Sequence, residues 1–202
     1  MGDRDHSDLG DAADKLLRAL EDEPKGDKIK QVIVYRRDLK MRKGKIAAQV
    51  SHASMKVFFD RQITGLDSTI RERISGDPHS FLVVPLDEPM GAWVRGIFTK
   101  IVLTVDNEDD LLRAYQMAQD AGLPCSLCTD AGITEFRDLC PDCAKPLGNT
   151  GMIIQQPIAC LTCGGKGTVP RPTNTAIAIG PAPASEIDKI TGPEGAVKTR
   201  LP

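Results

Sequence analysis

The basic segment at residues 36–45 is the part of this sequence best suited to binding an anion. Six of its ten residues are Arg or Lys, against a single acid, Asp38. An apolar run precedes the segment, and a stretch with helical periodicity follows it. Because a helix N-terminus adds backbone N–H groups and the positive end of the helix dipole, we expect a phosphate or another anion to bind here. The six basic residues are Arg36, Arg37, Lys40, Arg42, Lys43 and Lys45.

Four cysteines further along the chain have the chemistry and spacing of a structural zinc site. Two C-x-x-C pairs are separated by sixteen residues, which is typical of a four-cysteine zinc module. Four thiolates complete the tetrahedral coordination of Zn²⁺ and leave no position for a substrate, so the expected metal is structural. The four cysteines are Cys140, Cys143, Cys160 and Cys163.

A third pair, Cys125 and Cys128, falls in an apolar stretch, where cysteine behaves as a small hydrophobic residue. Core packing is the favoured role for this pair. The alternative, in which it binds metal together with Cys140 and Cys143, stays open from the sequence.

Composition points to a globular protein with a specific anionic partner. The 202 residues are 41% hydrophobic and 27% charged, with a net charge of −2, so the basic segment is a local feature of a near-neutral chain. The N-terminus lacks the pattern of a signal peptide, and no apolar run is long enough to span a membrane. These features, with cysteines only in C-x-x-C pairs, predict a cytoplasmic protein and argue against secretion or membrane insertion.

Strand and helix patterns alternate along the chain, which predicts an α/β fold with helices covering a mostly buried sheet. Pro89, Gly91 and Gly96 indicate loop structure around a short strand at 81–86. The basic segment and the turn at Asp130 both follow strand ends, where α/β sheets bind ligands, so they are candidates for one shared site. The predicted strands are 29–36, 81–86, 98–105, 125–128 and 175–179, and the predicted helices are 43–59, 67–74, 107–121 and 184–190.

The chain divides into three parts by composition. Residues 1–27 are acidic and poor in apolar residues, which predicts a flexible extension. Residues 28–136 and 173–202 carry the α/β pattern. Residues 137–172 interrupt this pattern with four cysteines and five prolines, which predicts an inserted zinc-binding module.

Several segments, in order, resemble the type-two peptidyl-tRNA hydrolases of archaea and eukaryotes. The first is KQVIVYRRDLKMRKGKIAAQVSHA at residues 30–53. Trp93-x-x-Gly96 follows, with the strand IFTKIVLTV and the helix DNEDDLLRAYQMAQDAGLP after it. The turn TDAGITE at 129–135 and the segment AIAIGPAP at 176–183 complete the likeness. Arg42 departs from the family, which usually has glycine there.

The resemblance implies a three-layer α/β sandwich, in which helices cover both faces of a mixed four-stranded sheet, with the zinc module as a small insertion. It also implies hydrolysis of the ester that joins a peptide to the 3′-terminal ribose of tRNA, without a catalytic cofactor. The expected partner is therefore peptidyl-tRNA. Ribosome association and a homodimer stay open, as does a related hydrolase acting on another nucleotide-linked ester.

Ester hydrolysis needs an activated water, a stabilised oxyanion and a proton for the leaving hydroxyl. With the resemblance, these needs point to Lys45 facing the oxyanion, Asp130 orienting or deprotonating the water, and Thr134 relaying a proton or binding the ester. Each has an ordinary reading as well: a solvated lysine, a turn former and a strand threonine. The rival function is a non-catalytic tRNA- or ribosome-binding module on the same fold.

The remaining site predictions are contacts with tRNA. Basic side chains would pair with phosphates, and the helix face that carries Lys45 would add polar contacts. For His52 a hydrogen-bonded structural role is favoured over catalysis, because seven residues of helix separate it from Lys45 by about 10 Å. The predicted tRNA-binding residues are Arg36, Arg37, Lys40, Arg42, Lys43, Gln49, His52 and Lys56.

Overall fold

The computed structural model describes residues 27–61, 83–143 and 160–202. Almost all of the acidic extension and the helix expected at 67–74 therefore lie outside the described residues. Within the described ranges, no helix has the length and apolarity needed to cross a membrane.

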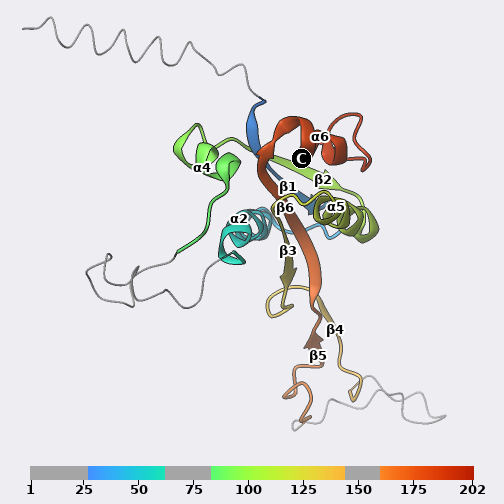
Figure 1. Cartoon of the computed structure of the whole chain (residues 1–202). Helices are drawn as coiled ribbons and strands as arrows, with labels where there is room; N and C mark the ends of the chain where they lie inside the picture. Colours follow the sequence, from blue (N-terminus) through green and yellow to red (C-terminus); the bar gives the residue numbers. More distant parts are fainter. Residues whose placement is uncertain (1–26, 62–82, 144–159) are drawn as a thin grey trace, which may run out of the picture.

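A mixed four-stranded sheet forms the centre of the molecule (Figure 1). Its strands lie in the order β2-β1-β6-β3. The first strand runs parallel to β2, whereas β6 runs antiparallel to both of its neighbours. This topology confirms the predicted mixed sheet. The strands are β1 (Ile29–Arg36), β2 (Lys100–Val105), β3 (Cys125–Asp130) and β6 (Thr173–Pro183).

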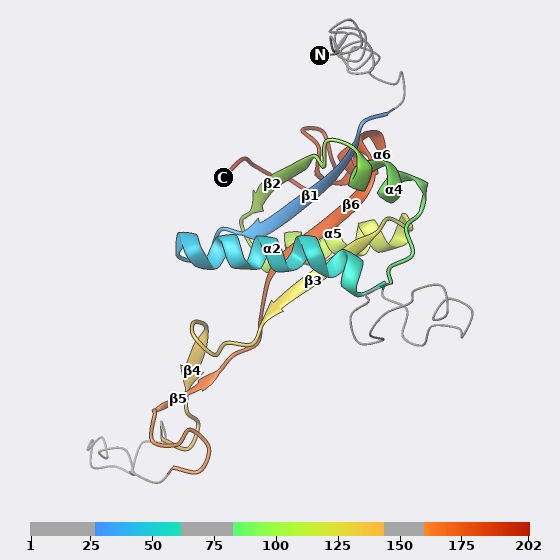
Figure 2. The same ribbon diagram turned by 90° about the vertical axis from the view of Figure 1, so that its left-hand side faces the viewer.

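Helices cover both faces of the sheet, because the apolar side chains of β1 alternate between the two faces. Val32 and Val34 pack in the cluster that includes Leu111 and Ile187, from α5 (Glu108–Asp120) and α6 (Ala184–Thr191). Ile33 packs on the other face with residues of α2 (Lys43–Phe59) and α4 (Glu88–Arg95). Figure 2 shows α2 lying along its face of the sheet. The three-layer sandwich is thus confirmed.

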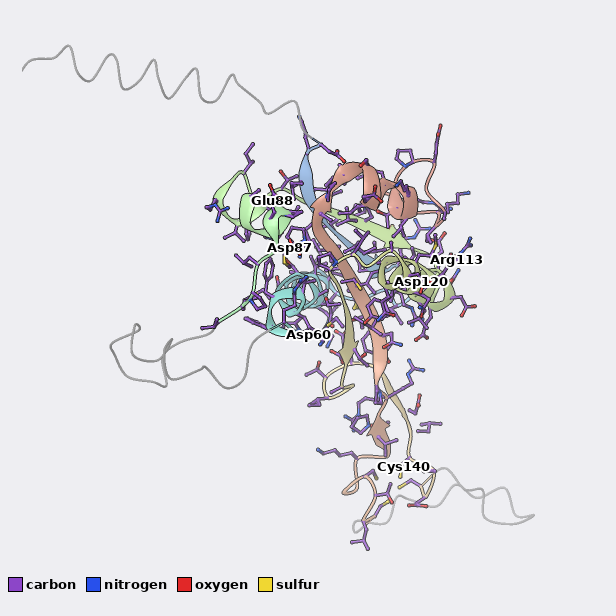
Figure 3. The ribbon with its side chains drawn as sticks, in the orientation of Figure 1. Asp60, Asp87, Glu88, Arg113, Asp120 and Cys140 are labelled. Carbon is purple, nitrogen blue, oxygen red and sulfur yellow. The ribbon has the colours of Figure 1, made fainter. Side chains whose placement is uncertain are left out.

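The loop expected around Pro89, Gly91 and Gly96 is wrong for residues 88–95, which form helix α4. Asp87 lies at the start of α4 (Figure 3) and caps the helix by accepting a hydrogen bond from the Met90 N–H at 2.9 Å. Pro89 lies in the first turn, where no N–H is needed. Residues 83–86 of the expected 81–86 strand form no strand. Buried Met90 and Trp93 hold α4 on the sheet.

A narrow arm extends from the end of β3 and the start of β6 (Figures 1 and 2). It consists of the antiparallel strands β4 (Arg137–Leu139) and β5 (Thr168–Pro170), and it carries the four cysteines beyond them. Figure 3 shows Cys140 on this arm, away from the helices. The arm occupies the place of the predicted insertion at residues 137–172.

Candidate active site

An ion pair between Lys45 and Asp130 lies where α2 begins and β3 ends. Lys45 is in the first turn of α2, and Asp130 is the last residue of β3, so packing of α2 on the sheet brings them together. The Lys45 Nζ donates a hydrogen bond to the Asp130 Oδ2. Their side chains are only 15% and 10% exposed. Two of the three predicted catalytic residues therefore meet directly.

Asp130 accepts two further hydrogen bonds that fix its carboxylate. The Gln49 Nε2 donates to Oδ2 at 2.9 Å, and the Gly132 N–H donates to Oδ1 at 2.8 Å. Burial raises the pKa of Asp130, but the Lys45 ammonium together with these two donors outweighs it and lowers the pKa below its ordinary value of 3.8. Asp130 is therefore ionised at neutral pH.

Gln49 orients Asp130 and also lines the cavity, while its contact with tRNA stays a prediction. It is buried, and its Oε1 accepts hydrogen bonds from the Thr175 hydroxyl at 2.7 Å and the Cys128 thiol at 3.1 Å. These two donors fix the amide so that Nε2 faces the carboxylate. Gln49 lies four residues after Lys45, so the sequence places both on the same face of the helix. No nearby residue in the sequence indicates the role of Thr175.

Lys45 and Asp130 line a cavity of about 600 Å³. Thr134 lines this cavity, as expected, and is exposed there. His52 also lines it with an exposed side chain, so it is available to a ligand. Its favoured structural role and its contact with tRNA both stay predictions. Arg42 and Glu135 form part of the rim and pair with each other at 2.8 Å.

The basic segment separates into structural and exposed cations. Arg36 is buried and pairs with Asp38 at 2.7 Å and with Glu108 at 2.9 Å. The hydrogen bond with Asp38 is the main cause that raises the Arg36 pKa, although burial opposes it. Arg36 therefore holds β1 to the start of α5, and its predicted role in binding phosphate is corrected.

The other cations of the predicted tRNA-binding set are more accessible. Arg37 and Lys56 pair with exposed acids, Asp106 and Asp60 respectively. Arg42 is paired with Glu135, yet its side chain is 81% exposed. Both Lys40 and Lys43 are exposed as well. Arg42 and Lys45 are the two cations of the basic segment that line the cavity itself.

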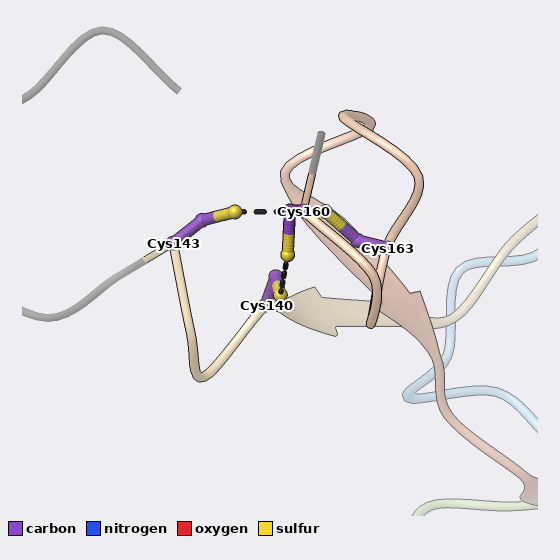
Figure 4. A group of neighbouring side chains, drawn as sticks. All are labelled: Cys140, Cys143, Cys160 and Cys163. Atoms are coloured by element: carbon purple, nitrogen blue, oxygen red, sulfur yellow. Dashed lines mark hydrogen bonds between the residues drawn. The ribbon is translucent and has the colours of Figure 1, made fainter. Parts of the chain in front are cut away.

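The four cysteines of the arm form one cluster (Figure 4). All four sulfur atoms lie within 4.8 Å of one another, with 3.8 Å between Cys140 and Cys160 and 3.5 Å between Cys143 and Cys163. Zinc–sulfur bonds of about 2.3 Å in a tetrahedron require sulfur separations of about 3.8 Å. The donor set and its spacing fit a tetrahedral metal ion.

Cys125 and Cys128 lie outside this cluster. Cys128 is buried beneath α2 and Cys125 packs against the opposite core, so the favoured core role is confirmed. Burial raises the pKa of both thiols, which suits neutral core residues.

The base of the arm contacts the turn that carries Asp130. Gly132 has a φ of +72°, and a Cβ there would lie 2.5 Å from the Arg171 nitrogen, so the turn requires glycine. The Arg171 N–H donates to the Phe136 carbonyl at 2.8 Å. The Phe136 ring in turn lies 5.8 Å from the Lys45 Nζ. The base of the arm is thus connected to the Lys45–Asp130 pair through Phe136 and the Gly132 turn.

Comparison with known proteins gives a consistent family. Residues 29–144 match the family model described as Peptidyl-tRNA hydrolase PTH2. A peptidyl-tRNA hydrolase of Methanopyrus kandleri is 32% identical over 163 residues, which cover 81% of this chain and 93% of that protein. One from Methanocaldococcus jannaschii is 31% identical over 164 residues, covering 81% and 96%. The chain therefore belongs to the PTH2 family of peptidyl-tRNA hydrolases.

Proposed function

We propose that this protein hydrolyses the ester between a peptide and the 3′-terminal ribose of tRNA, and so returns the tRNA to use. The observation that carries the proposal is the Lys45–Asp130 pair, held in the wall of a cavity beside the exposed cations at the start of α2. A cation can stabilise the oxyanion of this reaction and a fixed carboxylate can orient the water, while the exposed cations suit the phosphates of the tRNA.

The low pKa of Asp130 favours an orienting role over proton abstraction. A carboxylate with a pKa below 3.8 is a weak base at neutral pH, but its oxygens accept hydrogen bonds strongly. In the proposed mechanism Asp130 orients the attacking water and holds Lys45 in place. The water oxygen bonds to the ester carbon, and the Lys45 ammonium stabilises the resulting oxyanion.

Collapse of the tetrahedral intermediate breaks the bond to the 3′ oxygen, which takes up the proton that the attacking water releases and leaves as a hydroxyl. Thr134, exposed in the cavity wall, is placed to relay this proton or to hold the ester. His52 borders the same cavity and contacts the tRNA terminus in this scheme. The reaction needs no cofactor.

Exposed Lys40, Arg42 and Lys43 are the proposed phosphate contacts. Arg37 and Lys56 are second in rank, because each must leave a carboxylate partner before it pairs with a phosphate. Each phosphate contact made by a cation steepens the dependence of log K on log salt by about 0.9.

The cysteine module, residues 137–172, is proposed to hold one structural Zn²⁺. Four thiolates leave no open coordination position, so the metal would stabilise the arm and take no part in hydrolysis. Because the base of the arm contacts Gly132 and Phe136, the folded arm supports the turn that ends in the catalytic cavity.

Recovery of intact tRNA tests the proposal. The purified chain is incubated with N-acetylaminoacyl-tRNA, and the released tRNA is then recharged by its aminoacyl-tRNA synthetase. Ester hydrolysis leaves an intact 3′ end, so full recharging is expected. A chain that binds tRNA without releasing the acyl group is a binding module, and a tRNA that cannot be recharged has been cut elsewhere. Either result would overturn the proposal.

A further inference from the structure

An exposed apolar groove lies beside the C-terminal half of α2, at the other end of the helix from the basic segment. It has a volume of about 610 Å³ and is bounded by α2, α4 and the start of β2. Met55 and Phe59 of α2 are 52% and 42% exposed, and Val94 and Phe98 across the groove are 44% and 48% exposed. Large apolar side chains gathered in one exposed concave surface mark a binding surface.

The groove is held in shape by strained backbone and stacked rings. Phe98 has a φ of +62°, which is uncommon and strained for a bulky residue. Its ring lies 3.8 Å from the Trp93 ring, and the Lys100 Nζ lies 3.3 Å above it. The Trp93 indole N–H is fixed by the Thr99 carbonyl at 2.8 Å. Backbone strain that the surroundings maintain is typical of a functional surface.

The groove is largely without charge of its own. Within the described ranges Lys100 contacts aromatic rings and forms no ion pair with a carboxylate. Partial burial lowers its pKa. A nucleic acid needs several cations for its phosphates, and Lys40, Arg42 and Lys43 lie at the other end of α2, whereas Lys56 near the groove is paired with Asp60. The groove therefore suits an apolar ligand far better than a second segment of RNA.

The order of features along α2 matches the order of parts in the substrate. The exposed cations lie at the helix N-terminus, Lys45 and Gln49 in the first turns, and the groove along the later turns. In peptidyl-tRNA the nucleic acid, the ester and the peptide follow one another in the same order. Both cavities are lined by the middle turns of α2, the first by His52 and the second by Ser51.

The distance along α2 indicates which residues of the peptide would reach the groove. Ten residues separate Lys45 from Met55, which corresponds to about 15 Å along α2 at ~1.5 Å per residue. An extended peptide covers about 3.3 Å per residue. The groove is thus reached by peptide residues about five positions from the ester.

We propose that this groove binds apolar side chains of the peptide moiety, about four to six residues from the ester. The proposal rests on the hydrolase function proposed above. It assigns to the chain a preference among peptidyl-tRNAs by peptide length and by apolar character at these positions.

The test compares three substrates on the same tRNA: an N-acetylaminoacyl group, an N-acetylhexapeptide with Leu at the three residues farthest from the ester, and the same hexapeptide with Ser there. We expect kcat/KM for the Leu hexapeptide to exceed that for the Ser hexapeptide by about tenfold, the order of one well-placed apolar contact. In the double variant Met55→Ser/Val94→Ser, we expect this ratio to fall to about two.

The matched control is Leu201→Ser, which removes a 76% exposed apolar side chain elsewhere and should keep the wild-type ratio. Equal rates for the two hexapeptides with the wild-type protein would overturn the groove proposal. So would a dimer, measured by light scattering, that the double variant converts to a monomer, because the groove would then join two copies. Failure to release even the N-acetylaminoacyl group would instead refute the hydrolase function.

Discussion

Replacing Asp130 with Asn tests the catalytic centre with little change of shape. The Asn Oδ1 can still accept the Gly132 N–H, but its amide group would face the Lys45 ammonium and the Gln49 Nε2. Gln49 cannot turn to relieve this, because its Oε1 already accepts from Thr175 and Cys128. The variant therefore loses two hydrogen bonds to a charged group and leaves Lys45 without its partner.

The size of the effect follows from this geometry. Breaking a buried ion pair costs about 3–5 kcal/mol, and the residual exposure of both side chains points to the lower end. For a chain of this size, 3 kcal/mol corresponds to a fall in Tm of about 6–12 °C, which leaves the variant folded at 25 °C. Without an oriented water and a fixed Lys45, we expect kcat to fall by about 10²–10⁴-fold.

Release of radiolabelled N-acetylaminoacyl from tRNA at 25 °C, with circular dichroism as the fold check, measures both effects. Asp106→Asn is the matched control, since Asp106 is an exposed acid that pairs with Arg37 and Arg200 away from the cavity. The control should keep activity within about twofold. A folded Asp130→Asn protein with wild-type kcat would refute the reasoning.

Three further predictions concern charge and metal. Because the folded pKa of Asp130 is depressed, its stabilisation is present above the unfolded value and is lost as pH falls through the folded one. The difference in urea midpoint between wild type and Asp130→Asn should therefore shrink below about pH 3.8. A difference that stays constant over this pH range would contradict the prediction. Arg36→Met should lower the free energy of unfolding by about 3 kcal/mol, whereas Lys43→Met should leave it within 0.5 kcal/mol and reduce the salt slope of tRNA binding by about 0.9. The opposite pattern in chemical denaturation and salt titration would restore Arg36 as a phosphate contact. Metal analysis should find one zinc per chain, absent from Cys160→Ser/Cys163→Ser and retained in Cys125→Ala; zinc retained by the double variant would exclude this cluster.

The sequence was most informative where local pattern and tertiary structure agree. The bounds of β1 and α2 were predicted to the residue, because the apolar run 32–35 is buried throughout and α2 has a regular buried stripe. The cysteine pairs likewise predicted their own cluster, since C-x-x-C spacing is a local geometric requirement. The likeness of 129–135 to a known turn predicted a shared site for Asp130, Thr134 and Lys45, and all three line the same cavity.

The misses are contacts between segments distant in sequence. Arg36 and Lys43 look alike in the chain, but Glu108 approaches Arg36 from the start of α5 and, with the neighbouring Asp38, makes Arg36 a buried structural cation. Gln49 orients Asp130 through partners on β3 and β6, which helical spacing alone does not reveal. Pro89 favours a loop at α4 because proline breaks helices in general, yet Pro89 is favourable in a first turn capped by Asp87.

The most direct test of the central claim is a single-turnover measurement of N-acetylaminoacyl release with Lys45→Ala beside wild type, both in excess over tRNA. Saturating enzyme removes differences in tRNA affinity, so the observed rate reports the chemical step. Loss of the oxyanion donor predicts a rate lower by about 10²–10³-fold, with tRNA still bound in a filter assay. A rate within threefold of wild type would place the catalytic centre elsewhere and contradict the account.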